Sequence, residues 1–380
     1  MSENPPSAST PLRIVAVRTL VFRAPLAEPV QTSFGTMRDR PALLVRVEDE
    51  NGCFGWGEVW CNFPAVGAEH RAHLLDSLIA PILRERAWAD PGTAFRELSR
   101  RLHVLTLQSG EHGPMAQIVA GTDVALWDLA ARRAAQPLWK ILGGTPTVPV
   151  YASGLNPGKP EALAAKKLQE GHRAFKLKVG FGEERDRANL AALRALVGPL
   201  PLMVDANQAW EPEQARAMSA ALAPFAPLWL EEPIAADRPL AAWQQLARAT
   251  HIPLAAGENL RGLDAFEGAL GAAAFGVIQP DLGKWGGFSG CLEVGKMARS
   301  RGVMFCPHWL GGGIGLAASL HLMAAVGGPG YVEVDANPNP LRELGVIPAF
   351  KVQEGRIHLS DIPGLGVVPN LAAMEPYRVQ

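Results

Sequence analysis

The segment AFKLKVGFGEERDRANLAALRALVGPLPLMVDA, residues 174–206, contains the pattern that decides the fold. It begins with the apolar run AFKLKV, continues through a stretch rich in alanine, leucine, glutamate and arginine, and ends with the apolar run LMVDA. The two apolar runs are typical of strands, and the stretch between them is typical of a helix. Because parallel strands are joined by helical crossovers, the segment predicts one strand–helix–strand unit.

The same unit recurs along the chain from about residue 148. Eight strand-like runs begin 26, 28, 26, 26, 22, 27 and 28 residues apart. They are VPVYAS (148–153), AFKLKV (174–179), LMVDA (202–206), LWLEE (228–232), LAAGE (254–258), GVIQPD (276–281), VMFCPH (303–308) and YVEVD (331–335). Eight such units predict an α/β fold of the (β/α)8-barrel type. A doubly wound open sheet is the alternative, and the lack of a glycine-rich phosphate motif after the first run counts against it.

The chain divides into three predicted parts. Residues 1–130 are predicted to form an α+β capping domain, of which residues 1–10 are expected to be a loose tail. Residues 131–340 form the predicted barrel. Residues 341–380 are expected to pack back on the capping domain and to complete it.

Strand-like and helical patterns in sequence support this division. The capping domain has strand-like segments at 13–26 and 40–60, the second broken by the turn ENG, and then helical segments at about 67–107 and 116–134. Near the end of the chain, FKVQEGRIHLS (350–360) predicts a hairpin.

The composition is that of an ordinary globular protein, with 48% hydrophobic residues and a net charge of −1. This charge gives no reason to expect nucleic acid or an anionic membrane as a partner, and no apolar run reaches the length of a membrane span. The four cysteines lack metal-like spacing, so reduced thiols and a cytoplasmic location are expected. The expected partners are a small-molecule substrate and further copies of the chain in a homo-oligomer.

Acidic residues end three consecutive predicted strands. Asp205, Glu231 and Glu258 lie 26 and 27 residues apart, and in a barrel the carboxyl ends of the strands form the active-site rim. Three converging carboxylates repel one another unless a cation offsets their charge, and hard oxygen ligands favour Mg²⁺. The alternative is that each acid caps a helix or pairs with a lysine.

Lys176 and Lys178 lie side by side on the second predicted strand, because residues two apart point to the same face. Taken alone, the pair indicates an edge strand with both lysines in water. In a closed barrel, which has no edge, Lys178 instead faces the metal site of the neighbouring strand. A divalent cation and Lys176 are expected to lower the pKa of Lys178 to about 7–8, which suits a general base.

Two further strand ends carry ionisable side chains on the other side of the predicted rim. His308 ends the seventh predicted strand, and Asp281 ends the neighbouring sixth. A carboxylate beside an imidazole fixes its tautomer and raises the basicity of the other nitrogen. Glu333, on the eighth strand, either donates a proton to the substrate or accepts a hydrogen bond from it, or is a plain solvated acid. His308 alone would be interpreted as structural.

At this point the sequence resembles the enolase superfamily, and within it the mandelate racemase subgroup, over about residues 13–368. The motifs are AGTDVALWDLAARRAAQPLWKILGG (120–144), KLK (176–178), VDAN (204–207), LEEP (230–233), GEN (257–259), QPDLGKWGG (279–287) and CPHWLGGG (306–313). The resemblance implies a modified barrel with an N-terminal capping domain, and Mg²⁺-assisted removal of the proton next to a substrate carboxylate, giving an enediolate.

The resemblance also implies a role for each matching residue. It makes Asp205, Glu231 and Glu258 the metal ligands, Lys178 the base with Lys176 as its electrostatic partner, His308 and Asp281 the dyad on the other face, Glu333 the electrophilic donor, and Asn207 and Glu232 supporting residues. The choice of subgroup depends on Asp281, since the muconate-cycloisomerase subgroup has a lysine there. Lys284 lies three residues later and receives no role.

The overall reaction stays open between two outcomes of the same chemistry. Dehydration of an acid sugar is favoured by analogy with the family, and the segment 28–40, with hydroxyls and with Arg38 and a second arginine, suits a polyol acid. Racemisation or epimerisation of a 2-hydroxy acid or an amino acid derivative is the alternative, and Trp60 and Trp309 near the site would suit a less polar substrate. A barrel without activity that acts as a binding protein is a further alternative.

Overall fold

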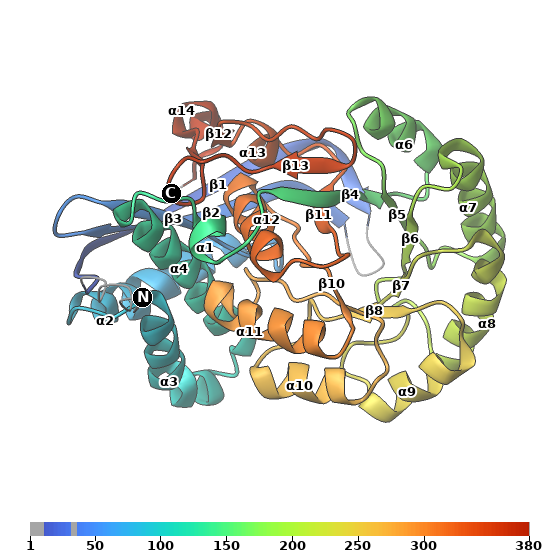
Figure 1. Cartoon of the computed structure of the whole chain (residues 1–380), viewed down its shortest axis with the longest axis horizontal. Helices are drawn as coiled ribbons and strands as arrows, with labels where there is room; N and C mark the ends of the chain where they lie inside the picture. The colour runs from blue at the N-terminus through green and yellow to red at the C-terminus, as the bar shows by residue number, and fades with distance from the viewer. Residues whose placement is uncertain (1–10, 32–35, 380) are drawn as a thin grey trace, which may run out of the picture.

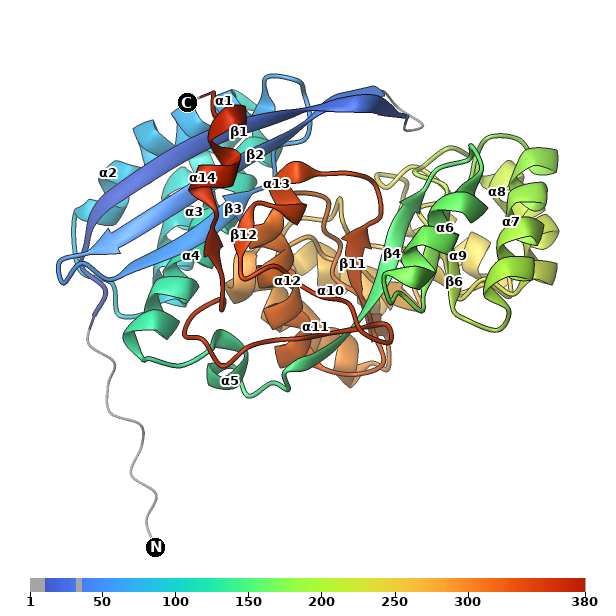
Figure 2. The same ribbon diagram turned by 90° about the horizontal axis from the view of Figure 1, so that it is seen from above.

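The computed structural model describes residues 11–31 and 36–379. The predicted N-terminal tail (1–10) and the middle of the segment 28–40, residues 32–35, lie outside the described residues. Figures 1 and 2 show the two bodies of the molecule, a capping domain that contains the N-terminal sheet and a barrel of alternating strands and helices.

The capping domain is built on a three-stranded antiparallel sheet. Its strands are β1 (Ile14–Gln31), β2 (Thr36–Asp49) and β3 (Phe54–Val59), in the order β1-β2-β3. The predicted turn lies between β2 and β3, where the Asp49 side chain accepts hydrogen bonds from the backbone N–H groups of Asn51 and Cys53. In Figure 2, β1 and β2 extend from the capping domain toward the barrel helices.

Helices cover one face of this sheet. They are α1 (Gly67–Leu74), a π-helical turn (Leu75–Ile79), α2 (Ala80–Arg84), α3 (Pro91–Ser109) and α4 (His112–Arg133), and the short α5 (Leu138–Ile141) follows and packs against α12 (Gly313–Val326) of the barrel. Glycines allow α4 to lie directly against β3, since a Cβ atom on Gly57 would lie 2.0 Å from the Gly121 carbonyl oxygen. The predicted helical segment 67–107 contains several separate helices instead of one. The predicted helix 116–134 corresponds to the larger part of α4.

The barrel contains eight parallel strands, and each overlaps one of the eight predicted runs. They are β4 (Thr147–Leu155), β5 (Phe175–Lys178), β6 (Leu202–Asp205), β7 (Leu230–Glu231), β8 (Leu254–Ala256), β9 (Val277–Ile278), β10 (Met304–Phe305) and β11 (Val332–Asp335). Their order is β10-β9-β8-β7-β6-β5-β4-β11, so β11 pairs with β4, and no ladder joins β10 to β11 in the described part of the chain. The predicted barrel is confirmed, with this one seam open.

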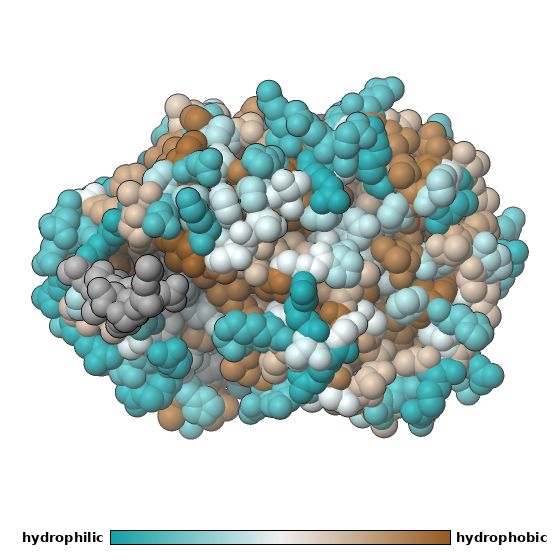
Figure 3. Space-filling model, in the orientation of Figure 1, coloured by the Kyte–Doolittle hydropathy of each residue, from teal (hydrophilic) through white to brown (hydrophobic). Residues whose placement is uncertain are grey.

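Seven helices connect the strands and surround the sheet (Figure 1). They are α6 (Pro160–Gln169), α7 (Glu183–Val197), α8 (Pro212–Leu222), α9 (Leu240–Ala249), α10 (Leu263–Gly271), α11 (Gly287–Ser300) and α12 (Gly313–Val326). On the face shown in Figure 3, hydrophilic residues dominate the outer rim and hydrophobic residues lie in patches between them. Among residues 11–31 and 36–379, no helix combines the length and the apolar character that crossing a membrane requires.

The C-terminal segment contacts both bodies, which corrects the prediction for it. Its elements are α13 (Pro340–Glu343), β12 (Val346–Ile347), β13 (Arg356–His358), β14 (Val368–Pro369), α14 (Leu371–Met374) and a final 3-10 turn (Glu375–Tyr377). The predicted hairpin is only a tight turn, because β13 pairs with the start of β4 in the barrel. The last residues do return to the capping sheet, where the Val379 N–H donates to the Val21 carbonyl.

Glu58, at the end of β3, ties the capping domain to the loop that follows β10. It is buried and accepts hydrogen bonds from the backbone N–H groups of Gly312 and Gly315, at the start of α12. Asn62 donates a second hydrogen bond across the same interface, 2.6 Å long, to the Leu310 carbonyl. Burial raises the pKa of Glu58 to about 7, although these N–H groups favour its charged form.

Replacing Glu58 with alanine is expected to lower the free energy of unfolding by about 3 kcal/mol, because two buried N–H groups lose their acceptor. Denaturant unfolding checks this value, with Glu48→Ala as a control, since the Glu48 side chain lies on the same sheet and is partly exposed. Equal stability of the two variants would show that the Glu58 hydrogen bonds to the start of α12 do not stabilise the fold.

Candidate active site

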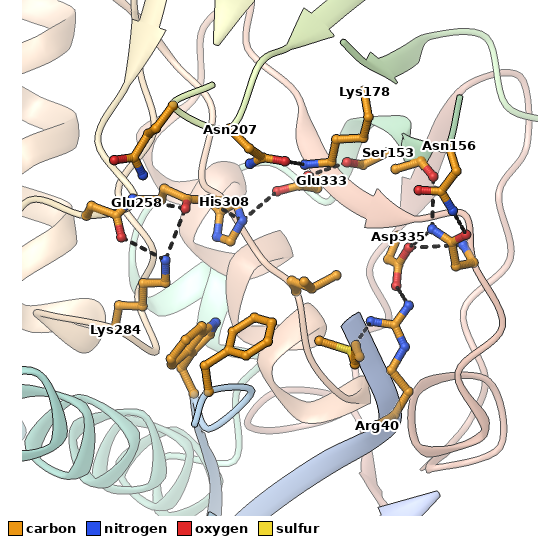
Figure 4. Close-up of a pocket in the computed structure, with 18 residues that line it drawn as sticks. Arg40, Ser153, Asn156, Lys178, Asn207, Glu258, Lys284, His308, Glu333 and Asp335 are labelled. Atoms are coloured by element: carbon orange, nitrogen blue, oxygen red, sulfur yellow. Dashed lines mark hydrogen bonds and ion pairs between the residues drawn. The ribbon is translucent and has the colours of Figure 1, made fainter. Parts of the chain in front are cut away.

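A cavity of about 330 Å³ lies at the carboxyl ends of the barrel strands, beneath the capping domain. Figure 4 shows its polar side chains turned toward one another. The capping domain contributes Met37, Arg40, Trp60 and Phe63, and the barrel contributes Ser153, Gly154, Asn156, Lys178, Asn207, Gln208, Glu258, Asn259, Lys284, His308, Leu310, Glu333, Asp335 and Asn337. The rim of a barrel is where loop and strand-end residues are free to do chemistry.

The two lysines of β5 lie inside this rim, so the edge-strand interpretation is wrong. Lys176 is completely buried, with its Nζ 2.6 Å from Glu231 Oε1 and 2.9 Å from Glu333 Oε1. Lys178 lines the cavity, and its Nζ donates to Asp205 Oδ2 at 2.6 Å and to Asn207 Oδ1 at 2.7 Å. Lys176 thus lies among carboxylates, and Lys178 contacts one carboxylate and one amide oxygen.

The pKa of Lys178 differs in direction from the prediction. Burial opposes its charge, but the Asp205 and Glu231 charges and the hydrogen bond to Asp205 together outweigh burial, and the pKa is raised above its usual value. The predicted lowering assumed a divalent cation on Asp205, which would remove this attraction and add repulsion. The direction therefore depends on whether the neighbouring carboxylates hold a metal ion.

The three predicted metal ligands follow neighbouring strands. Asp205 ends β6 and pairs in register with Glu231, which ends β7, and Glu258 lies two residues beyond β8. Burial and the Asp205 charge together raise the pKa of Glu231 to about 7. A cation between these carboxylates would relieve that cost, and their oxygen donors suit Mg²⁺. The residues present therefore fit the metal.

The same carboxylates are bridged by protein cations in this structure. Lys178 contacts Asp205, and the His308 Nε2 lies 2.6 Å from Glu258 Oε2. In the part of the chain that the structure describes, no three acidic, histidine or cysteine side chains are already grouped as ligands of one ion. A metal ion would have to take the place of these lysine and histidine contacts.

His308 and Asp281 form the predicted pair. The His308 Nδ1 lies 2.6 Å from Asp281 Oδ2, and Asp281 is itself fixed by the backbone N–H groups of Gly283 and Lys284. Burial opposes charge on His308, but Glu258 and Glu333 outweigh burial and raise its pKa well above the usual value. The imidazole thus lies in the cavity with its orientation fixed.

Glu333 lies between the two sides of the site. It is buried and accepts hydrogen bonds from the Ser153 hydroxyl and from the Trp309 backbone N–H, and its Oε2 is 3.5 Å from His308 Nε2. Its pKa is lowered, because Lys176 and His308 outweigh the effect of burial. The interpretation of Glu333 as a plain solvated acid is therefore wrong.

The supporting residues Asn207 and Glu232 have distinct places. Asn207 lines the cavity beside Lys178, and its backbone N–H donates to Asp205 Oδ1 at 2.8 Å. Glu232 is buried behind the rim, where the side chains of Gln208 and Asn259 donate to it. Burial and the nearby Glu258 charge raise the pKa of Glu232 to about 8.

Two predicted substrate contacts lie elsewhere. Trp309 is 2% exposed and packs in the hydrophobic core, so only its backbone reaches the site through Glu333. Arg38 is exposed on β2, and the arginine that lines the cavity is Arg40. Strand alternation would give the two arginines the same face, but the β1–β2 register shifts between Pro25 and Val30, beside this part of β2. Trp60 lines the cavity, where it was expected.

Lys284 received no role in the sequence analysis, yet it lines the cavity. Its Nζ lies 3.2 Å from both Glu258 Oε1 and Asn259 Oδ1, and 4.8 Å from the centre of the Trp60 ring. Asp335 was also missed. A signal for it existed, because Asp335 lies two residues after Glu333 on β11 and so faces the same side.

Family models match both bodies of the chain. The N-terminal domain of the mandelate racemase/muconate lactonizing enzyme family matches residues 14–143, and an enolase C-terminal domain-like model matches residues 160–373. The chain belongs to the mandelate racemase/muconate lactonizing enzyme family. The resemblance to the enolase superfamily is thereby confirmed.

Individual relatives of the family cover nearly the whole chain. D-galactarolactone cycloisomerase from Agrobacterium fabrum is 31% identical, covering 97% of this chain and 99% of its own length. Arabinonate dehydratase from Saccharolobus solfataricus is 28% identical, covering 88% and 90%. The chain is thus similar to family members named for both isomerase and dehydratase reactions.

Two solved structures of the family are close to this fold. A mandelate racemase/muconate lactonizing enzyme from Bordetella bronchiseptica RB50 has a TM-score of 0.90 and 53% identity, covering 97% of this chain and all of its own. A racemase from Streptomyces coelicolor A3(2) with bound magnesium has a TM-score of 0.88 and 30% identity, covering 96% and 100%. Magnesium is therefore bound by at least one structural relative.

Proposed function

We propose that this protein removes the proton next to a substrate carboxylate with the help of Mg²⁺, and that its overall reaction is the dehydration of an acid sugar. One observation carries the proposal. Lys178 and His308 project from different sides into one cavity, and buried carboxylates lie beside them (Figure 4). The arrangement offers a base, an acid and a cation site around the space for a single substrate.

Asp205, Glu231 and Glu258 would hold the metal ion. When bound, Mg²⁺ supplies positive charge for the oxygens of the substrate carboxylate, where negative charge grows as the α-proton leaves. Lys176 adds a fixed buried positive charge behind these ligands, with its Nζ 3.5 Å from Asp205 Oδ2 and 2.6 Å from Glu231 Oε1. Charge that is already in place costs no reorganisation during the reaction.

The chain's own residues account for the proton movements. Lys178 Nζ, in its neutral form, takes the α-proton, and the electrons of the C–H bond pass into an enediolate. His308, held by Asp281, then gives a proton to the β-hydroxyl, which leaves as water while the Cα–Cβ double bond forms. The resulting enol rearranges to a 2-keto acid. Glu333 lies close enough to His308 to hold its Nε2 toward the cavity.

The lining of the cavity supports a polyhydroxylated substrate. The lining combines amides and a hydroxyl group with the apolar side chains of Met37, Trp60, Phe63 and Leu310. Each carbon of a sugar acid chain carries both a hydroxyl and a C–H group, so polar and apolar lining residues both find partners. The similarity to an arabinonate dehydratase and to a D-galactarolactone cycloisomerase supports the same class of substrate.

Racemisation or epimerisation is the second candidate, favoured by the presence of titratable groups on both sides of the cavity. In that reaction His308 would return a proton to the carbon itself and no hydroxyl would leave. A cytoplasmic location and a homo-oligomer remain predictions.

A screen separates these reactions. The protein with Mg²⁺ is incubated in D₂O with a library of acid sugars, 2-hydroxy acids and amino acid derivatives, and NMR follows loss of the α-proton signal. We expect exchange with at least one acid sugar, accompanied by a 2-keto-3-deoxy product. Exchange that inverts configuration without loss of water would establish the second candidate, and no exchange with any compound would contradict the proposed function.

A further inference from the structure

We propose that the end of the cavity formed by Arg40, Asn156, Asp335 and Asn337 binds a second carboxylate of the substrate, so that the protein selects acid sugars with a carboxylate at each end. This inference rests on the proposed function, which places the reacting carboxylate near Lys178. Figure 4 shows Arg40 rising from β2 toward Asp335, at the opposite end of the cavity from Lys284.

Arg40 has more hydrogen-bond donors than partners. It is 2% exposed, its Nη2 donates to Asp335 Oδ2 at 2.7 Å, and its Nη1 donates to the Met37 sulfur at 3.1 Å. Its Nε is buried and finds no acceptor among the residues that the structure describes. A guanidinium has five N–H donors, and a thioether is a weak acceptor. Arg40 is therefore fixed by one carboxylate, with donors to spare for a ligand.

Both carboxylate oxygens of Asp335, by contrast, already have partners in the protein. Its Oδ1 accepts from the backbone and the side chain of Asn337, at 3.0 and 2.9 Å. Its Oδ2 accepts from Arg40 and lies 3.3 Å from Arg342 Nη1. Asp335 thus holds the arginines in place and is not the group that contacts substrate.

The charges at this end favour an anion. One buried carboxylate, Asp335, is shared by two buried arginines, Arg40 and Arg342. Glu343 contacts Arg342 at 2.9 Å, but its side chain is 50% exposed, so water screens that pair. The buried groups alone therefore leave one positive charge, and a carboxylate that accepts from Arg40 would offset it.

Lys284 also lines the cavity, and it is the second positively charged side chain to consider as a partner for a distant substrate carboxylate. Its Nζ already lies 3.2 Å from Glu258 Oε1 and 3.2 Å from Asn259 Oδ1, and the charges of Glu258, Asp281 and Glu232 act on it. A substrate carboxylate at that end would meet several acidic groups. Arg40 is for this reason the better site for a second carboxylate.

The test compares sugar acids that differ only in their last carbon. Each pair contains an aldonate, which ends in CH₂OH, and the aldarate of the same configuration, which ends in a carboxylate; D-galactonate with galactarate and D-gluconate with D-glucarate are two such pairs. Titration calorimetry with Mg²⁺ present gives the dissociation constants. In the wild type, at least one aldarate is expected to bind about tenfold more tightly than its aldonate, as one charge-assisted hydrogen bond would provide.

Variants assign the preference to Arg40. Arg40→Met keeps the bulk and is expected to bring the two affinities of a pair within about threefold, while Arg38→Met, on the same strand but exposed, keeps the wild-type ratio. Arg40→Lys keeps the charge without the planar guanidinium and is expected to retain part of the preference. If Arg40→Met does not fold, Arg40→Lys and the wild type still give the comparison.

Two results would overturn the inference. One is a wild type that binds no aldarate more tightly than its paired aldonate, and the other is a preference that persists in a folded Arg40 variant without the positive charge. The proposed function fails separately, if the wild type exchanges no α-proton of any acid sugar in D₂O.

Discussion

Replacing Lys178 with methionine is expected to lower turnover by about 10⁴-fold, the upper range for one general acid–base group. The variant keeps the length of the side chain and removes the only nitrogen that the proposal uses to take the α-proton. Substrate binding is expected to change far less, because Mg²⁺ and the rest of the cavity remain. Steady-state kinetics on the substrate identified in the screen measures both quantities.

Lys166→Met is the matched control, since the Lys166 side chain is 68% exposed on α6, a helix outside the barrel sheet. It is expected to turn over at the wild-type rate. A folded Lys178→Met variant with more than about a tenth of wild-type turnover would show that another group is the base.

Removing the metal ion is expected to abolish turnover and to lower the melting temperature. Asp205, Glu231 and Glu258 repel one another without a cation, and Mg²⁺ that binds only the folded state at 100 times its dissociation constant stabilises by about 2.7 kcal/mol. EDTA should produce both losses, and added Mg²⁺ in excess should restore turnover and the melting temperature. Differential scanning fluorimetry and turnover, with and without EDTA, are the two readouts.

Glu231→Gln tests the site itself. The variant keeps the shape of the side chain but removes one ligand charge, and we expect it to lose most of the rise in melting temperature with Mg²⁺. Glu211→Gln is the control, because the Glu211 side chain is 75% exposed. If neither Mg²⁺ nor EDTA changes the melting temperature or the turnover of the wild type, the alternative of a binding protein without metal chemistry is favoured.

The fold was predictable because its repeating unit is local. Each strand and helix of the barrel fits within fewer than 30 residues, so apolar periodicity alone located all eight strands. The C-terminal segment was less predictable, because β13 pairs with β4, about 200 residues earlier in the chain. Local patterns carry no information on a pairing of that separation.

The two lysines and the three carboxylates were predictable for a related reason. A residue at the end of a barrel strand must lie on the rim, and Lys178, Asp205 and Glu231 each end a strand. Their roles as base and ligands remain predictions, which the experiments above address.

The capping-domain contacts were not predictable in the same way. Arg40 instead of Arg38 faces the cavity because the pairing of β1 and β2 is irregular beside it, and a period of two residues cannot show such a shift. Trp309 is buried because the side chain packs into the core beside α12, although its neighbour His308 lines the cavity. Lys284 lies beyond the end of its strand, and only the folded loop brings it to Glu258.

The central claim is that Lys178 takes the α-proton and that His308 acts at the opposite side of the same substrate. The most direct measurement is loss of the α-proton signal in D₂O by NMR, comparing the wild type with folded Lys178→Met and His308→Asn variants in Mg²⁺. For a dehydratase, the account predicts that His308→Asn still exchanges the α-proton but releases no product, whereas Lys178→Met exchanges nothing. Normal dehydration by His308→Asn, or exchange by Lys178→Met at the wild-type rate, would contradict it.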